Sequence, residues 1–282
     1  MSRKTVADIK EMKEKGQPIV MVTAYDYPLS RLAQEAGADI LLVGDSLGNV
    51  VLGYESTTSV DMEDMVRACA AVARAPGEAH IVCDMPFLSF QISPEEALRN
   101  AGRLIREGGA QSVKMEGGRQ VVPTVKKLVE SGIPVMGHIG LTPQSVHQLG
   151  GYRVQGRSLE EARRLLEDAL ALEEAGVYSL VLEAVPWQLA QLITRRLRIP
   201  TIGIGAGLGC DGQVLVIHDL IGLSFGKPAK FVKRYAQVGE IIRQAVADFA
   251  ADVREKRYPE PAHQYNLSPE TWEALQKALE SR

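Results

Sequence analysis

The sequence has little of several features that define whole classes of proteins. Its three cysteines, Cys69, Cys83 and Cys210, are odd in number and far apart, so neither a disulfide framework nor a Cys-x-x-Cys motif is expected. No stretch approaches the roughly 18 apolar residues of a membrane-spanning helix, and residues 1–5 lack the apolar core of a secretory signal. We therefore expect a cytoplasmic protein whose thiols stay reduced.

Excess positive charge is also missing. The chain has 32 Lys and Arg against 35 Asp and Glu, a net charge of −3, and no basic, aromatic-rich face. Proteins that bind nucleic acids or anionic membranes usually present such a face, so we expect neither partner. The 282 residues are 45% hydrophobic and 24% charged, which is typical of a globular protein.

What the sequence does have is a regular alternation of short apolar segments and helical patterns. Eight segments are expected to be strands: residues 19–24, 40–43, 80–83, 111–115, 133–136, 178–182, 201–204 and 214–218. This alternation predicts an α/β fold with parallel strands, a (βα)8 TIM barrel, with an open doubly wound sheet as the alternative. No Gly-x-Gly-x-x-Gly follows the first strand, which disfavours a dinucleotide-binding fold. The connection over 205–213 is short for a parallel crossover and is the weakest part of this assignment.

Both ends of the chain add to the barrel. Thr5 and Asp8 resemble a helix cap and its acidic partner, so a short N-terminal helix is expected before the first strand. A helix over 238–256 would be the last of the barrel. Tyr258-Pro259-Glu260-Pro261 then interrupts the chain, and Ser268 begins a short final helix. We predict a catalytic barrel domain over 1–257 and an appended tail over 258–282, packed on the outside or on a neighbouring subunit.

Ionisable and polar residues follow five of the predicted strands. In parallel α/β folds the loops at the carboxyl ends of the strands carry the ligand sites, and in a barrel these ends surround one mouth. The residues expected there are Asp45, Ser46, Asp84, Lys114, Glu116, His138 and Glu183.

This set of side chains indicates a hard-metal site with a nearby base. The carboxylates of Asp45, Asp84 and Glu116 would repel one another without a cation between them, and oxygen ligands favour Mg²⁺. Lys114 lies on the same strand face as Glu116 and is suited to bind an anionic substrate group. Glu183, from the opposite side of the ring, is free to act as a base.

Each residue taken alone also has a purely structural interpretation. Asp45 and Asp84 are also typical of turn caps, Lys114 of a structural ion pair, and His138 of a hydrogen bond to the backbone. The glycines of residues 205–207 fit either a phosphate cradle or a tight turn. The joint occurrence at consecutive strand ends favours function.

Several motifs, in order along the chain, resemble one known family. They are Val43-Gly44-Asp45-Ser46-Leu47-Gly48, Asp84-Met85-Pro86-Phe87, Val113-Lys114-Met115-Glu116-Gly117, Pro134-Val135-Met136-Gly137-His138-Ile139-Gly140-Leu141-Thr142-Pro143, Gly203-Ile204-Gly205-Ala206-Gly207, Asp211-Gly212-Gln213 and His218-Asp219. Over about residues 3–260 the chain closely resembles the ketopantoate hydroxymethyltransferases. No functional position departs from the family pattern, and only the tail after Pro259 is extended.

The resemblance implies a TIM barrel of the phosphoenolpyruvate/pyruvate superfamily type, assembled as a homodecamer. It implies transfer of a one-carbon unit from 5,10-methylenetetrahydrofolate to α-ketoisovalerate, through an enolate stabilised by Mg²⁺, to form ketopantoate in pantothenate biosynthesis. Asp45, Asp84 and Glu116 would form the Mg²⁺ site, with Ser46 and Lys114 at the substrate oxygens. Glu183 would be the general base, with His138 the next candidate.

Two other functions would share parts of this sequence pattern. Another Mg²⁺-dependent 2-oxo acid lyase or mutase of the same barrel superfamily is the main alternative. A lyase of the isocitrate type would be expected to carry a cysteine in the loop after the fourth strand, where this sequence reads Gly117-Gly118-Arg119. A catalytically inactive scaffold would be expected to have lost the site chemistry, which is intact here.

Overall fold

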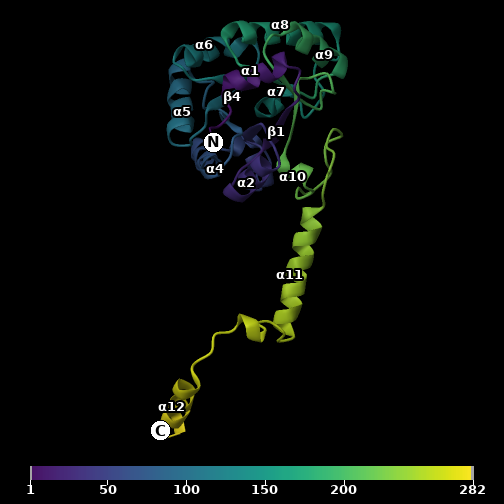
Figure 1. Cartoon of the computed structure of the whole chain (residues 1–282). Coiled ribbons are helices and arrows are strands. Elements are labelled where there is room, and N and C mark those ends of the chain that lie inside the picture. Colours follow the sequence, from purple (N-terminus) through teal and green to yellow (C-terminus); the bar gives the residue numbers. More distant parts are fainter. Residues whose placement is uncertain (1, 281–282) are drawn as a thin grey trace. The chain divides into compact units, whose positions relative to one another are not determined.

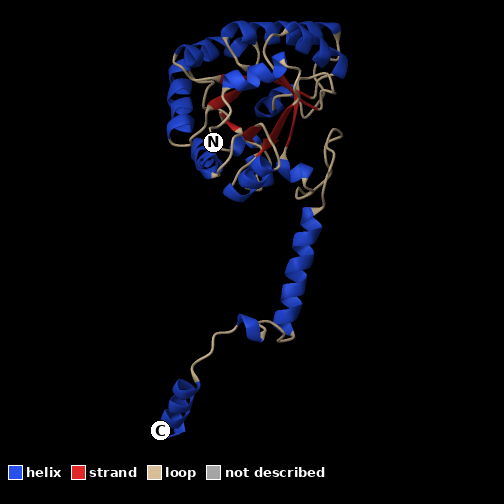
Figure 2. Cartoon of the chain, in the orientation of Figure 1, coloured by secondary structure: helices blue, strands red, loops and turns tan. Residues whose placement is uncertain are grey.

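Eight parallel strands close into a barrel in the computed structural model, which describes residues 2–280 (Figure 1; Figure 2). The strands pair in sequence order, and β8 pairs with β1 to close the sheet. They are β1 (Ile19–Thr23), β2 (Ile40–Val43), β3 (His80–Asp84), β4 (Ser112–Glu116), β5 (Val135–Gly140), β6 (Ser179–Glu183), β7 (Thr201–Ile204) and β8 (Gly212–Leu215). The predicted barrel is confirmed, and the open sheet is excluded.

Helices alternate with the strands of the barrel, further helices follow in the C-terminal part of the chain, and several helix starts follow local sequence signals. The helices of four or more residues are α1 (Val6–Glu14), α2 (Tyr27–Glu35), α3 (Leu47–Val50), α4 (Met62–Arg74), α5 (Pro94–Arg106), α6 (Val122–Glu130), α7 (Val146–Leu149), α8 (Leu159–Ala175), α9 (Trp187–Arg196), α10 (Ile217–Leu220), α11 (Val238–Arg254) and α12 (Pro269–Glu280). The helices α1 and α8 begin with capping boxes at Thr5 and Ser158. Each of these side chains accepts a hydrogen bond from the backbone N–H three residues later, which has no partner within the helix. None of the helices within residues 2–280 is long and apolar enough to cross a membrane.

The connection from β7 to β8 contains no helix. Residues 205–211 suffice because the two strands are staggered, with Ile202 opposite Gly212. Asp211 fixes this connection: its Oδ2 accepts from the Thr201 backbone N–H at 2.8 Å and lies 2.9 Å from Lys13 Nζ of α1. The eighth strand is therefore present, and a short loop connects it to the seventh.

Side chains of alternate parity along the strands fill two separate cores. One set points into the barrel and packs with Ile9 of α1, which is fully buried and extends the core at one end. The other set points outward and packs under the helices, with Leu41, Ile81 and Val113 among its fully buried members. Strands buried on both faces explain the continuous apolar runs in the sequence.

A buried histidine lies at the amino-terminal end of β3. His80 is 1% exposed; its Nδ1 lies 3.0 Å from the Lys4 carbonyl oxygen and its Nε2 2.8 Å from Ser112 Oγ. Since a carbonyl can only accept, the neutral ring donates from Nδ1, and Nε2 accepts from the serine hydroxyl. Burial lowers the pKa of His80 to about 4.

This histidine should make the fold sensitive to acid. An unfolded histidine has a pKa near 6.5, so between about pH 6.5 and 4 the unfolded chain binds a proton that folded His80 does not. Its contribution to stability is therefore complete above pH 6.5 and is lost as the pH falls toward 4. We expect His80→Gln to lose less free energy of unfolding between pH 7 and 4 than the wild type, by up to roughly 3 kcal/mol. Urea unfolding of both proteins at equal concentration measures this, and equal losses would contradict it.

The chain divides into two compact units, Met1–Tyr235 and Ala236–Arg282. The division lies upstream of the boundary expected at residue 257, and the helix expected to be the last of the barrel, α11, falls in the second unit. Neither α11 nor α12 has a buried side chain. Helical periodicity located α11 correctly, but periodicity does not identify the surface that an apolar helix face covers.

Candidate active site

One pocket at the carboxyl ends of the strands collects all six predicted site residues. It has a volume of about 160 Å³ and is lined by Asp45, Ser46, Asp84, Lys114, Glu116 and Glu183, together with His138. We call it the carboxylate pocket. Residues up to 138 positions apart in the sequence meet here because they follow or end strands β2 to β6.

A close backbone approach holds the first two carboxylates together. The Asp45 N–H donates to Asp84 Oδ2 at 3.1 Å, across the ends of β2 and β3. A Cβ at Gly44 would lie 3.0 Å from Ser46 Oγ and 3.5 Å from Asp84 Oδ2. Glycine at position 44 therefore leaves room for this turn, and Ser46 is oriented by a hydrogen bond of 2.8 Å to the Tyr25 hydroxyl.

The pocket holds more buried acid than base. Lys114 Nζ lies 2.9 Å from Asp84 Oδ1, and both side chains are 5% exposed. Burial lowers the pKa of Lys114, whereas the surrounding carboxylates, Asp84 foremost, raise it. The combined effect of the carboxylates on this pKa is the larger, so the lysine is protonated. Burial and then Asp84 raise the pKa of Asp45 well above its usual range, and burial also raises the pKa of Asp84 against the effect of Lys114. An added cation would relieve this strain on the carboxylates.

The donor set suits a cation that keeps part of its water shell. Within residues 2–280 no group of three or more His, Cys, Asp or Glu side chains is arranged to hold a metal ion without other ligands. The carboxylates of Asp45, Asp84 and Glu116 line the same pocket, and several of their oxygens are already hydrogen-bonded to protein groups. Mg²⁺ is commonly bound through only one or two carboxylates, with waters and substrate oxygens as the other ligands. The residues present therefore fit Mg²⁺ better than a metal that requires a closed protein cage.

His138 connects the acidic residues on two sides of the pocket. Its Nδ1 lies 3.4 Å from Glu116 Oε1, and its Nε2 lies 3.2 Å from Glu183 Oε2. Burial and Lys114 lower the pKa of His138, but Glu116 and Glu183 raise it to about 9. The 3.2 Å contact between Lys114 Nζ and His138 Nδ1 is a hydrogen bond only when the ring is neutral at Nδ1. In either state, His138 Nε2 faces the carboxylate proposed as the base.

Sequence reasoning missed Gln144, which joins two of the carboxylates. This residue is 6% exposed and lies in the 3₁₀ turn η3 (Pro143–Ser145) after β5. Its Nε2 donates to Asp45 Oδ2 and to the Met85 carbonyl, both at 2.9 Å, and its backbone N–H donates to Glu116 Oε2 at 3.0 Å. An uncharged glutamine in a long polar loop carries no pattern that would single it out, so only the folded chain reveals this role.

Loss of the Gln144 amide should destabilise the protein. Gln144→Met keeps the chain length but leaves Asp45 Oδ2 and the Met85 carbonyl without this donor. An unsatisfied buried polar group costs about 1–3 kcal/mol, so we expect the free energy of unfolding to fall by that amount. Gln148→Met is the control, because Gln148 is exposed and its side chain has no hydrogen bond within residues 2–280. Equal stability of the two variants in urea unfolding would contradict this role.

Aromatic side chains pack against the glycines after β7, so these glycines do not form an open cradle. A Cβ at Gly205 would lie 2.7 Å from the Phe231 ring, and one at Gly207 would lie 2.4 Å from Trp187 Cβ. Both glycines have positive φ, at 65° and 80°. The structure therefore favours the tight-turn interpretation of residues 205–207 over the phosphate cradle.

Solved structures of similar fold include a hydrolase and a phosphomutase. A phosphonopyruvate hydrolase in complex with oxalate and Mg²⁺ superposes with a TM-score of 0.60 at 10% identity, covering 99% of each chain. A phosphoenolpyruvate phosphomutase from Streptomyces platensis subsp. rosaceus has a TM-score of 0.59 at 15% identity, covering 99% of this chain and 96% of that one. At these identities the likeness shows the fold alone, a TIM barrel.

Sequence relatives are much closer. The 3-methyl-2-oxobutanoate hydroxymethyltransferase of Carboxydothermus hydrogenoformans is 54% identical over 275 residues, 98% of this chain and 100% of the relative. That of Moorella thermoacetica is 56% identical over 264 residues, 94% of this chain and 98% of the relative. The sequence model described as ketopantoate hydroxymethyltransferase matches residues 3–261. With its barrel, its pocket and these relatives, the chain belongs to the ketopantoate hydroxymethyltransferase family, enzymes of pantothenate biosynthesis.

Proposed function

We propose that the carboxylate pocket transfers a hydroxymethyl group from 5,10-methylenetetrahydrofolate to α-ketoisovalerate, with Mg²⁺ as cofactor. The observation that carries this proposal is the convergence of Asp45, Ser46, Asp84, Lys114, Glu116 and Glu183 on one buried pocket. A 2-oxo acid offers a carboxylate and an adjacent keto oxygen. Such a substrate needs positive charge at its oxygens and a base at C3, and the pocket supplies both.

The acidic side of the pocket would hold the cofactor and the substrate oxygens. By family resemblance, Asp45 and Asp84 would bind Mg²⁺ directly and Glu116 through water, and all three carboxylates already accept hydrogen bonds from protein groups. When bound, Mg²⁺ would act as a Lewis acid that stabilises negative charge on the keto acid. Ser46, oriented by Tyr25, and the protonated Lys114 would hold the substrate carboxylate and keto oxygens.

Glu183 would remove the proton from C3 of the keto acid. Its side chain is 16% exposed and lies beside His138 Nε2, which orients the carboxylate at the edge of the pocket. The nucleophilic C3 would then form a C–C bond to the one-carbon unit of the donor. The bonds from that carbon to the folate nitrogens break, tetrahydrofolate leaves, and one water supplies the hydroxyl oxygen of the hydroxymethyl group. Pro143 and Tyr152 of the long segment after β5 line the same pocket and limit the access of bulk water to it.

We also propose a homo-oligomer, a decamer by family resemblance, in a reducing cytoplasm. The apolar side chains of α11 support self-association, since Ile241, Val246 and Phe249 are each more than half exposed. The three cysteines are unpaired, which suits a reducing compartment. We expect light scattering at micromolar concentration to show a large assembly, and a stable 30.7 kDa monomer would contradict this.

Activation of the keto acid provides a test that needs no donor. The protein with Mg²⁺ should exchange the C3 proton of α-ketoisovalerate for deuterium from D₂O, followed by proton NMR. Exchange should stop after chelation and resume when Mg²⁺ is restored. The alternative, a 2-oxo acid lyase or mutase, is disfavoured by the close relatives, and it would instead show cleavage or rearrangement of a 2-oxo acid.

A further inference from the structure

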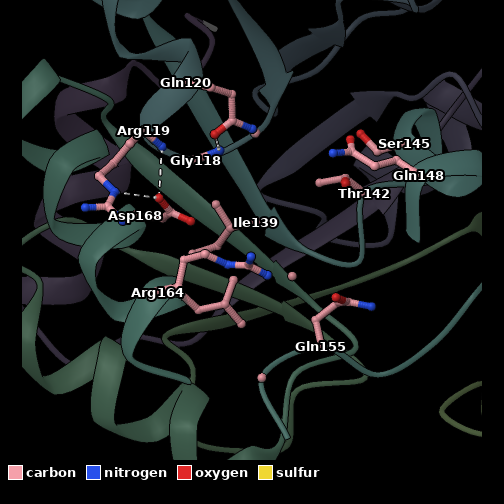
Figure 3. A pocket seen from close by; sticks show the side chains of 14 residues that line it. Gly118, Arg119, Gln120, Ile139, Thr142, Ser145, Gln148, Gln155, Arg164 and Asp168 are labelled. Carbon is pink, nitrogen blue, oxygen red and sulfur yellow. Dashed lines mark hydrogen bonds and ion pairs between the residues drawn. The ribbon is translucent and has the colours of Figure 1, made fainter. Parts of the chain in front are cut away.

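A second, larger cavity lies beside the carboxylate pocket and takes no part in the steps above (Figure 3). We call it the rim cavity; its volume is about 620 Å³. Its lining comes from residues 117–120 after β4, from the segment 139–156, and from Arg164, Leu165 and Asp168 of α8.

The rim cavity and the carboxylate pocket share a thin wall. Glu116 and His138 line the pocket, whereas their chain neighbours Gly117 and Ile139 line the rim cavity. Pro143 faces the pocket, and Thr142 faces the cavity. Much of this wall is the loop segment 140–156, whose only regular structure is η3 and the four-residue α7.

The sizes of the two spaces decide what each can hold. A drug-sized ligand usually occupies a pocket of about 300–1,000 Å³. The carboxylate pocket, at about 160 Å³, suits a small keto acid but cannot also hold the body of a folate. The rim cavity is within the required range and adjoins the place where the keto acid would react.

The lining offers hydrogen-bonding groups and apolar side chains. The amide side chains of Gln120, Gln148 and Gln155 face the cavity, and the Gly118 N–H donates to Gln120 Oε1 at 3.1 Å. Ile139 and Leu165 supply apolar contact for an aromatic ring. This combination suits an aromatic amide better than a small inorganic ion.

An arginine that lacks a partner stands at the edge of the cavity. The side chain of Arg164 has no hydrogen bond or ion pair within residues 2–280. The pKa of Glu161 is lowered mainly by hydrogen bonds to Ser158 and Arg157, and the charge of Arg164 adds a smaller effect. Its guanidinium extends toward Ile139 and Gln155 (Figure 3). Arg119, in contrast, is already engaged, 3.0 Å from Glu167 Oε2 and 3.3 Å from Asp168 Oδ1.

The cavity continues into a shallow groove of about 510 Å³ on the outer side of α8. Arg119 and Arg164 line both spaces, and Arg163 lines the groove. Glu160 and Glu167 also line the groove, so its charge is mixed, but Arg163 has no ion pair within residues 2–280. A flexible chain of carboxylates leaving the cavity would meet Arg164 first and then Arg163.

We propose that the rim cavity binds the p-aminobenzoyl-glutamate half of the reduced-folate donor, with its glutamate carboxylates at Arg164 and, for longer tails, Arg163. This assignment rests on the proposed function. From this half the one-carbon unit would extend toward the carboxylate pocket, past the segment 140–156 that lies between the two spaces.

The test compares two donors in Arg164→Gln and wild-type protein. With methylenetetrahydrofolate we expect the KM of Arg164→Gln to rise about tenfold, as for loss of one charged hydrogen bond. With methylenetetrahydropteroate, which lacks the glutamate, wild type and variant should have equal KM values. The KM for α-ketoisovalerate and the donor-free exchange of its C3 proton should not change. Arg195→Gln is the matched control, because Arg195 is an exposed arginine on α9 that lines neither space.

Two results would overturn the proposal: an unchanged KM for methylenetetrahydrofolate in Arg164→Gln, or an equal rise for both donors. Calorimetry with tetrahydrofolate alone keeps this test independent of turnover. If the wild type made no ketopantoate, the proposed function would fail. Binding of tetrahydrofolate weakened in Arg164→Gln and not in Arg195→Gln would still support the rim cavity as a folate site.

Discussion

Glu183→Gln should lose the exchange of the C3 proton of α-ketoisovalerate while keeping its affinity for the keto acid. Glutamine preserves the size of the side chain and its reach toward His138 Nε2, 3.2 Å away, but it cannot accept a proton. Loss of a general base typically costs about 10²–10⁴ in rate. Binding should survive because the groups proposed to hold the substrate oxygens, Ser46 and Lys114, are unchanged.

Exchange followed by NMR in D₂O and binding followed by calorimetry give the two readouts. Glu130→Gln, an exposed glutamate at the end of α6, controls for the change of charge. If Glu183→Gln exchanged the proton at the wild-type rate, Glu183 would not be the base, and its neighbour His138 would be the next residue to replace. Loss of both exchange and binding would indicate a role in substrate binding instead.

Asp84→Ala should abolish activity together with binding of Mg²⁺. Replacement of a group that only supports a metal ligand typically costs 10–100-fold in affinity, and loss of a direct ligand should cost at least about 100-fold. The alanine also leaves Lys114 without its ion-pair partner in a buried pocket, which is strongly destabilising.

Asp84→Asn limits the loss of stability, because an asparagine oxygen can still accept a hydrogen bond from Lys114 Nζ although the ion pair is lost. We expect a folded protein, by circular dichroism, that binds Mg²⁺ at least tenfold more weakly in calorimetry. Asp248→Asn, at an exposed aspartate of α11, should bind Mg²⁺ as the wild type does. Wild-type affinity for Mg²⁺ in folded Asp84→Asn would remove Asp84 from the metal site.

The barrel was predictable because each of its signals is local. The run 40–43 is apolar at every position since β2 is buried on both faces, and Gly44 marks where it ends. The site followed from the same signals, because parallel topology brings residues at the ends of strands to one mouth. Asp45, Asp84 and Glu183 lie far apart in the sequence and still line one pocket.

What could not be predicted depends on contacts between distant segments. Gln144 becomes important only because the turn after β5 reaches across the mouth of the barrel, which places its amide against Asp45 after β2 and its N–H against Glu116 of β4. The helix α11 has the expected start and nearly the expected length, but it falls in the second unit and has no buried side chain, which its periodicity could not reveal. The short β7–β8 connection is feasible because Asp211 binds both Thr201 and Lys13, a long-range arrangement.

Product formation from the three components tests the central claim most directly. The protein, Mg²⁺, α-ketoisovalerate and methylenetetrahydrofolate carrying ¹³C in its methylene group are incubated, and the products are followed by ¹³C NMR. We predict that the label appears in the hydroxymethyl carbon of ketopantoate, and that the signal is absent when Mg²⁺ is chelated or Glu183 is replaced by Gln. Unlabelled keto acid after prolonged incubation with folded wild-type protein, or labelling that persists without Mg²⁺, would contradict the proposed function.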